Sequence, residues 1–348
     1  MTGAAPGGAA LRFPHETPPA PGAAIEVAPG LRWLRMPLPF QLNHINLWLV
    51  EDGPGWTIID TGINNAATKG LWEQVFDGAL DGRKVTRLIC THYHPDHMGL
   101  AGWLTQRLQI ELWTTPGEWQ HAREAIADRP GTFQDDLMSF YRRIGFADLE
   151  ATLREGRPQG YRTLVTPVPE RFHPLADGME LAIGARRWRV IIGRGHAPEH
   201  ACLYCAELDL LIAGDQVLPK ISPNVSLWPR AADQDPLGSF IASLATLKRA
   251  VPDSAFVLPS HNLPFFGLHA RLDELQALHE ARLAEIVEHC RKPRTGAEIV
   301  PVLFRRALDG HQIGFAIGET MAHLARAVAD GALARHERED GVWMFERV

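Results

Sequence analysis

The chain has 348 residues and a formal net charge of -6 at pH 7, from 35 Lys+Arg and 41 Asp+Glu. Its 45% hydrophobic and 22% charged residues are those of an ordinary globular protein and exclude a largely disordered chain. No apolar run approaches the roughly 18 residues that span a bilayer, and the acidic balance argues against a surface that binds nucleic acid.

Histidine and cysteine usage is uneven, with 16 histidines and only 4 cysteines. So few cysteines make no disulfide framework, and we expect reduced thiols in a cytoplasmic protein. Any bound metal should therefore have nitrogen and oxygen ligands rather than sulfur.

The N-terminal part predicts a flexible segment followed by a hairpin. Residues 1–24 are rich in Gly, Pro and Ala and lack both the basic start and the unbroken apolar core of a signal peptide. Two strand-like segments, 45–50 and 56–60, flank a turn signal at 52–55. Strands and helices are then mixed over roughly 250 residues, which is typical of a layered α/β core.

A histidine-rich loop follows an apolar strand at 88–90. Three histidines and one aspartate fall within six positions, as His92, His94, Asp96 and His97. Loop residues at the carboxyl end of a strand can point into one cavity. Imidazole and carboxylate are ligands that suit zinc, and also iron or manganese. The loop therefore predicts a metal site.

A helical insertion is expected over about 117–172. Within it, residues 133–172 are rich in arginine, and no strand pattern returns until Leu181. A solvated helical surface is the simpler interpretation. The alternative is a lid that shapes the pocket and contacts an anionic substrate.

The tail, 271–348, has the outline of a winged helix. Amphipathic helices are predicted at 272–287, 296–308 and 317–329, followed by a terminal hairpin. A winged helix that grips DNA has a basic footprint, whereas residues 279–348 carry 10 Lys+Arg and 11 Asp+Glu, a balance of 10 − 11 = −1. Packing, or formation of a homodimer, is therefore the better expectation for the tail.

The loop His92–His97 resembles the His-x-His-x-Asp-His signature of the metallo-β-lactamase superfamily. Four further segments look like family motifs and occur along the chain in the family's order, the first of them before this loop. They are Ile58-Ile59-Asp60-Thr61-Gly62, Gly195-His196, Gly214-Asp215 and Ser260-His261. The resemblance covers roughly residues 25–270. It implies an α/β protein with a four-layer αββα sandwich and metals at one edge of its two sheets, followed by the winged-helix-like domain.

The resemblance also implies a dinuclear metal centre. It assigns His92, His94 and His196 to the first metal, Asp96, His97 and His261 to the second, and Asp215 to a bridge between them. Two divalent ions, Zn or alternatively Fe or Mn, would then convert a bridging water to the hydroxide that attacks the substrate. Asp96 is a candidate proton acceptor, and Asp60 is expected to orient a ligand or the metal loop.

The expected substrate class rests on features that differ between branches of the family. Because di-zinc β-lactamases lack an aspartate at the bridging position, Asp215 indicates the glyoxalase II, lactonase and nuclease side. The tail resembles the LACTB2-like branch, which contains thioester hydrolases and a single-strand endoribonuclease. We expect a small-molecule ester, thioester or lactone; the alternative is RNA cleavage. Candidate substrate contacts are Tyr93, Lys220 and His200, although Lys220 could be a solvated loop lysine and His200 could support the ligands.

Overall fold

The computed structural model describes residues 11–128, 131–146 and 160–348. Residues 1–10 of the expected lead-in, and Arg154 and Arg157 of the arginine-rich insertion, lie outside the described residues. The chain divides into two compact units. The first takes the described parts of 1–127, 161–223 and 245–272, and the second those of 128–160, 224–244 and 273–348. The domain boundaries expected from the sequence, 25–270 and 271–348, stay predictions.

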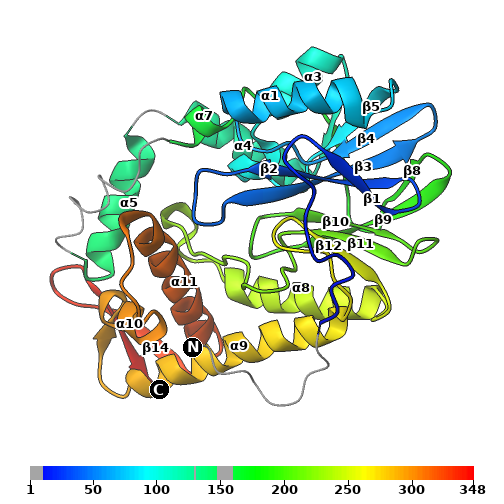
Figure 1. The fold of residues 1–348 in the computed structure, drawn as a ribbon. Coiled ribbons are helices and arrows are strands. Elements are labelled where there is room, and N and C mark those ends of the chain that lie inside the picture. The colour runs from blue at the N-terminus through cyan, green and yellow to red at the C-terminus, as the bar shows by residue number, and fades with distance from the viewer. Residues whose placement is uncertain (1–10, 129–130, 147–159) are drawn as a thin grey trace. The chain divides into compact units, whose positions relative to one another are not determined.

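The first unit contains a seven-stranded sheet (Figure 1). In sheet order its strands are β1 (Ala24–Ala28), β2 (Leu31–Pro37), β3 (His44–Asp52), β4 (Gly55–Ile59), β5 (Lys84–Ile89), β6 (Leu112–Thr114) and β7 (His173–Pro174). β3 and β4 form the predicted hairpin, in which Trp48 lies opposite Ile59. β4, β5 and β6 run parallel, so their carboxyl ends meet at the same edge.

A five-stranded sheet completes the sandwich of the first unit. Its strands, in sheet order, are β12 (Phe256–Pro259), β11 (Leu210–Gly214), β10 (His200–Cys205), β9 (Arg186–Gly193) and β8 (Glu180–Ile183). β10 is antiparallel to both β9 and β11, and β11 is parallel to β12. As a result β9, β11 and β12 all point the same way, and their carboxyl ends also share an edge.

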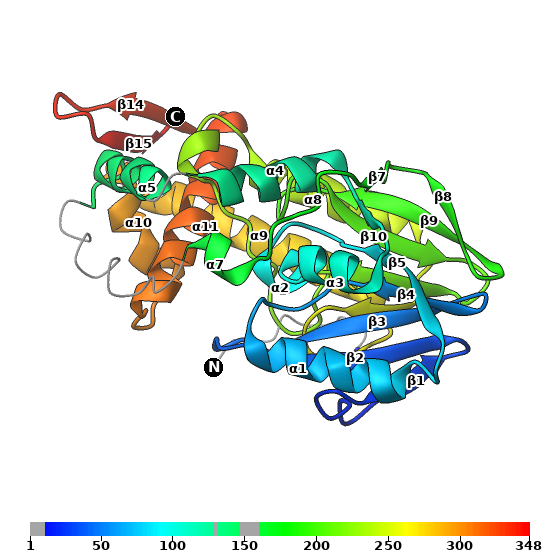
Figure 2. The same cartoon turned by 90° about the horizontal axis from the view of Figure 1, so that it is seen from above.

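Helices cover the outer faces of this sandwich. Between the sheets, buried Trp33 and Trp48 of the first sheet share a core with Trp188 and Leu203 of the second. On the other face of the first sheet lie α1 (Ala66–Gln74), the π-helical turn Val75–Ala79, α2 (Pro95–Met98), α3 (Ala101–Leu108) and α4 (Pro116–Ala127), as Figures 1 and 2 show. The end of α8 (Pro236–Ala250) lies against the second sheet, where Arg189 donates to the carbonyl of Ala250. The predicted αββα sandwich is confirmed.

The remaining elements are mostly helical. They are α5 (Thr132–Arg143), α7 (Tyr161–Leu164), the 3₁₀ turn Pro229–Ala231, α9 (Leu268–His289), α10 (Gly296–Leu303), α11 (Gly310–Ala329), and the strands β13 (Arg294–Thr295), β14 (Leu333–Glu337) and β15 (Trp343–Arg347). Except for α7 and the start of α9, they lie in the second unit, where β13, β15 and β14 form a small sheet.

The helices of the tail differ in length from the predicted ones. α10 begins at a capping box of Thr295 and Glu298, contains Pro301, and ends at Leu303, earlier than predicted. The following helix, α11, begins earlier than predicted, at Gly310. The second unit is thus a helical domain with a small sheet, and its winged-helix character stays a prediction. No helix in the described part of the chain is both long and apolar enough to cross a membrane.

A polar cluster lies inside the second unit, between α9 and α11. His279 Nδ1 lies 3.1 Å from His323 Nε2, and His323 Nδ1 donates to the carbonyl of Glu319 at 2.7 Å. The pKa of His279 is lowered to about 3 and that of His323 to about 4, mainly by burial. Arg282 pairs with the Glu319 carboxylate. Although these three potential ligands lie close enough for a metal, Arg282 already balances their only negative charge, so the cluster is a neutral imidazole pair beside an ion pair.

Candidate metal centre

Each residue of the predicted centre lies shortly after the carboxyl end of a strand. Asp60 follows β4, and His92–His97, the metal loop, follows β5 in the first sheet and runs into the short helix α2. His196, Asp215 and His261 follow β9, β11 and β12 in the second. Because the strands within each set are parallel, the two sheets bring residues more than 100 positions apart to one edge of the sandwich.

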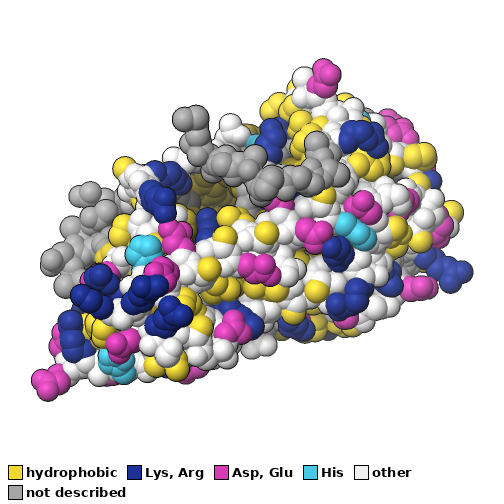
Figure 3. All heavy atoms as spheres, turned by 90° about the horizontal axis from the view of Figure 1, so that it is seen from below, with side chains coloured by type: hydrophobic (Ala, Val, Ile, Leu, Met, Phe, Trp, Pro, Cys, Tyr) yellow, Lys and Arg dark blue, Asp and Glu magenta, His cyan; other side chains and the backbone are white. Residues whose placement is uncertain are grey.

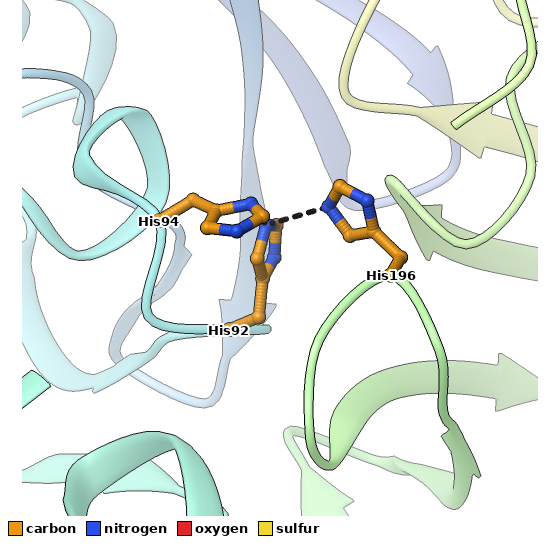
Figure 4. Close-up of side chains that lie close together, drawn as sticks. All are labelled: His92, His94 and His196. Atoms are coloured by element: carbon orange, nitrogen blue, oxygen red, sulfur yellow. Dashed lines mark hydrogen bonds between the residues drawn. The ribbon is translucent and has the colours of Figure 1, made fainter. Parts of the chain in front are cut away.

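Three histidines form the first group of potential ligands. Nε2 of His92 lies 2.9 Å from Nδ1 of His94 and 3.2 Å from Nε2 of His196. Figure 4 shows the rings of His94 and His196 meeting at the tip of the His92 ring. Ligand atoms around a tetrahedral zinc are about 3.3 Å apart. The three nitrogens therefore have the spacing of ligands to one ion.

The second group is Asp96, His97 and His261, whose ligand atoms lie within 4.8 Å of one another. Asp215 lies between the groups. Its Oδ2 is 3.5 Å from His196 Nε2 and 3.6 Å from His97 Nε2, while its Oδ1 is 3.4 Å from His261 Nε2. One carboxylate thus reaches a histidine of the first group and two of the second.

His97 shows that this arrangement suits a cation. Its Nδ1 lies 2.8 Å from the carboxylate of Asp60, which assigns the proton of a neutral ring to Nδ1 and leaves Nε2 as an acceptor. Nε2 is buried without a hydrogen-bond partner, 3.7 Å from the Asp96 carboxylate and 3.6 Å from that of Asp215. A lone pair and two carboxylates that face one another repel unless a positive charge lies among them. The donor set therefore fits divalent metal ions.

Without a metal, protons supply this positive charge. Burial lowers the pKa of His261, but the Asp215 and Asp96 carboxylates outweigh it and raise the pKa to about 10. His97 follows the same pattern, and its pKa lies well above the usual range. Conversely, burial opposes ionisation of Asp96, yet His97 and His261 bring its pKa down to about 2. The site therefore holds positive charge as protons when no metal is bound, and would hold it as metal ions when they are bound.

Asp60 fixes the metal loop through hydrogen bonds of its buried carboxylate. Its backbone has φ 62°, a left-handed conformation that Asp tolerates better than most residues. This places Oδ1 2.7 Å from the N–H of Thr91, while Oδ2 accepts from Thr91 Oγ1 at 2.8 Å and faces His97. One buried carboxylate thereby fixes both the start of the loop and the ring of His97.

His200 lies behind Asp215. The His200 ring is fully buried, and its Nε2 accepts from the N–H of Asp215 at 3.1 Å. Gly214 allows this contact, because a Cβ there would lie 2.4 Å from the ring, and its φ is +54°. Complete burial puts His200 in a supporting position rather than on an open pocket wall.

His44 plays a similar part for His261. The backbone carbonyl of His44 accepts from His261 Nδ1 at 2.7 Å, and its ring Nε2 accepts from the N–H of Asn262 at 2.8 Å. The carbonyl thus leaves Nε2 of His261 directed at Asp96 and Asp215.

The other two predicted substrate contacts differ in position. Tyr93 lies within the metal loop, and its ring centroid is 4.7 Å from that of His94. Lys220 is exposed, and the contact of its Nζ is with the Phe13 ring, 6.0 Å from the centroid. Tyr93 is therefore adjacent to the centre, whereas the role of Lys220 stays a prediction.

Sequence reasoning missed Glu118 and Tyr161, which both hold the metal loop. The Tyr161 hydroxyl donates to the carbonyl of Tyr93. Glu118 is fully buried and accepts from the N–H of Tyr93 at 2.9 Å; burial raises its pKa to about 7. A carboxylate four residues after β6, at the same sheet edge, was a signal for Glu118. Tyr161 follows a long insertion and had no such signal.

Comparison of the sequence with known protein families agrees with this geometry. The pattern of the family described as "Metallo-beta-lactamase superfamily" matches residues 41–261. The chain belongs to this superfamily. A second pattern, "Metallo-beta-lactamase-like, C-terminal domain", matches residues 283–348. The superfamily predicted from the motifs is confirmed, and its glyoxalase II-like or LACTB2-like branch stays a prediction.

Similar proteins cover nearly the whole chain. A beta-lactamase domain protein from Burkholderia ambifaria is 43% identical, with a TM-score of 0.91 over 97% of this chain and 98% of that one. A metallo-beta-lactamase family protein from Thermus thermophilus is 29% identical, with a TM-score of 0.78 over 93% of this chain and 100% of that one. The probable metallo-hydrolase YqjP of Bacillus subtilis (strain 168) is 24% identical over 309 residues, 87% of this chain and 93% of that protein. Membership of the superfamily and the His/Asp groups together support a metal-dependent hydrolase.

Proposed function

We propose that the protein is a dinuclear metal-dependent hydrolase that cleaves the ester, thioester or lactone bond of a small molecule. The observation that carries the proposal is Asp215, whose two oxygens approach histidines of both potential ligand groups. His92, His94 and His196 would hold one ion and Asp96, His97 and His261 the other, with Asp215 shared.

Bound divalent ions supply two things to such a reaction: a lowered pKa for water and polarisation of the substrate carbonyl. The protein's own residues then orient the groups and handle protons. The Asp96 side chain is 19% exposed, compared with 9% for Asp215, so Asp96 is the carboxylate better placed to accept a proton at the solvent side. Asp60 keeps the proton of His97 on Nδ1, away from the reacting side.

Zinc is our first choice of metal, because a three-nitrogen group and a mixed His/Asp group both suit it. Iron and manganese are the alternatives, since imidazole and carboxylate also bind these ions. All four cysteines are free and buried, and a reducing, cytoplasmic location is part of the proposal.

The substrate class is argued from charge. A single-strand nuclease needs a basic groove with stacking aromatic side chains. Figure 3 shows Asp and Glu side chains lying among the Lys and Arg side chains on one face rather than a continuous basic stripe, and the chain as a whole is acidic. These features favour a small-molecule substrate over RNA. The glyoxalase II-like or LACTB2-like branch, the winged-helix-like tail and a homodimer formed through it remain parts of the proposal.

The test combines metal analysis with substrate panels. Protein purified without added metal is assayed for bound metal and then incubated with acyl-thioesters, esters, lactones and single-stranded RNA. We expect close to two metal ions per chain and turnover of at least one carbonyl substrate. His94→Ala and Asp215→Ala should lose metal and activity, whereas the exposed His336→Ala should keep both. RNA cleavage without ester turnover would replace the proposed substrate, and full metal in both site variants would refute the centre.

A further inference from the structure

The first potential metal group depends on two separate stretches of chain. His92 and His94 lie in the loop after β5, whereas His196 lies in the loop after β9. The nitrogens of the two loops must stay about 3.3 Å apart to share one ion. A contact that fixes one loop against the other would therefore help to keep this spacing.

Glu118, in the first turn of α4, makes that connection. Its side chain is fully buried. Oε2 accepts from the backbone N–H of Tyr93 at 2.9 Å, and Oε1 accepts from the backbone N–H of Glu199 at 2.6 Å. Tyr93 lies between His92 and His94 in sequence, and Glu199 comes three residues after His196. One carboxylate thus bridges both loops of the first group.

Reciprocal contacts strengthen this bridge. The Glu199 carboxylate accepts from the N–H of Gly117 at 2.8 Å, and its carbonyl accepts from Thr115 Oγ1, also at 2.8 Å. Gly117 lets the carboxylate come close, because a Cβ there would lie 2.8 Å from Glu199 Oε2. The start of α4 and the His196 loop are therefore crosslinked in both directions.

The second group has different supports. His97 is held by Asp60, and its carbonyl accepts from the N–H of Thr61 at 2.9 Å. His261 is held by the carbonyl of His44. None of these contacts of His97 and His261 involves Glu118.

We propose that Glu118 is a positioning residue for the first metal group, because it fixes the loop of His92 and His94 against the loop of His196. This inference rests on the proposed dinuclear centre. A carboxylate suits the role because it offers an acceptor to each backbone N–H. A glutamine offers one acceptor and turns an NH₂ group toward the other N–H, which leaves a buried donor without a partner.

The test compares Glu118→Gln with Glu124→Gln, a matched change at an exposed position of the same helix. We expect wild type and Glu124→Gln to bind two zinc ions per chain. Glu118→Gln should bind one tightly and the other with affinity reduced about 10- to 100-fold, the usual loss when a support of a metal ligand is removed. Circular dichroism checks that the variant is folded.

Excess zinc separates a positioning role from a ligand role. It should restore the second equivalent in Glu118→Gln, whose ligands are intact, but not in His94→Ala. If Glu118→Gln does not fold, Thr115→Val removes only the hydroxyl contact with Glu199 and should show a milder form of the same selective loss. Two tight zinc ions in a folded Glu118→Gln, or equal weakening of both, overturns the inference while leaving the proposed function intact. A wild-type protein without metal overturns both.

Discussion

Nδ1 of His97 lies 2.8 Å from the Asp60 carboxylate, and the opposite nitrogen of the same ring faces Asp96 and Asp215. Asp60 therefore decides which nitrogen of His97 is available to a metal, although it is outside binding distance itself. A neutral ring can present a lone pair at Nε2 only while its proton stays on Nδ1.

Asp60→Asn should weaken metal binding without removing a ligand. The amide can donate to Nδ1 and so favour the tautomer with its proton on Nε2, which faces the site. We expect about 10- to 100-fold lower affinity for the metal held by His97, measured by competition with a chelator. Asp81→Asn, an exposed carboxylate that pairs with Arg32, is the control and should bind metal normally. Unchanged affinity in Asp60→Asn would contradict the proposed role.

Metal binding should release protons. In the metal-free protein the pKa of His261 is raised to about 10 and that of His97 lies well above its usual range, because nearby carboxylates outweigh burial. His261 is therefore protonated near pH 7.5 and must lose this proton to bind metal. We expect release of at least about one proton per centre, and affinity that rises with pH between 6 and 9.

Titration calorimetry in buffers of different ionisation enthalpy measures this release. The heat should depend on the buffer in proportion to the number of protons. A heat that is the same in every buffer would mean that the rings are already neutral before the metal arrives.

Gly214→Ala should disturb the centre through Asp215. Gly214 has φ +54°, and a Cβ would lie 2.4 Å from the His200 ring, which accepts from the N–H of Asp215. Gly53→Ala is the control, because Gly53 has φ +59° but nothing within 4 Å of its Cβ. Both variants carry the backbone cost of about 1–2 kcal/mol. Only Gly214→Ala should also lose metal, as thermal unfolding and metal analysis can show.

The pair His279–His323 should make the second unit sensitive to acid. Their pKa values, about 3 and about 4, lie below the ordinary value of 6.5 because burial disfavours the charged rings. The unfolded chain therefore binds more protons than the folded one once the pH falls below about 6.5. Stability present above that pH is lost as the pH falls toward 4, by on the order of 3 kcal/mol for each ring.

Hydrogen exchange of the α11 backbone amides reads this loss locally. His279→Leu with His323→Leu removes both hydrogen-bond partners together and should flatten the dependence between pH 6.5 and 4. Glu319, whose pKa burial raises, acts in the opposite direction and remains in the variant. An equally steep dependence in the double variant would show that other groups cause the sensitivity.

The sequence by itself indicated only the loop His92–His97, because its three histidines and one aspartate lie within six positions. Asp60, His196, Asp215 and His261 were assigned through the resemblance to the superfamily, and the structure brings all of them to one edge of the sandwich. Glu118 escaped notice because its function is set by partners at Tyr93 and Glu199 that only the folded sheets bring to it.

The second unit was harder to predict for the same physical reason. Its contacts join segments far apart in the chain, such as Phe140 and Trp343, whose rings lie 5.9 Å apart, and Phe240 and His279 at 5.5 Å. Helical periodicity indicates which face of a helix is buried but not which distant segment covers that face. The predicted start of α10 at Gly296 agrees with the structure, whereas the helix ends at Leu303, earlier than the periodicity suggested.

The second unit is built from three separate stretches of the chain, so no single cut separates it from the rest of the polypeptide. A stop codon after residue 272 would remove the segment that carries His279 and Trp343, yet leave Phe140 and Phe240 behind with their partners gone. Such a truncated protein would expose apolar faces and be prone to aggregate. Likewise, exchanging the tail for that of a relative requires matching changes in residues 131–146 and 224–244, so the tail cannot be exchanged on its own.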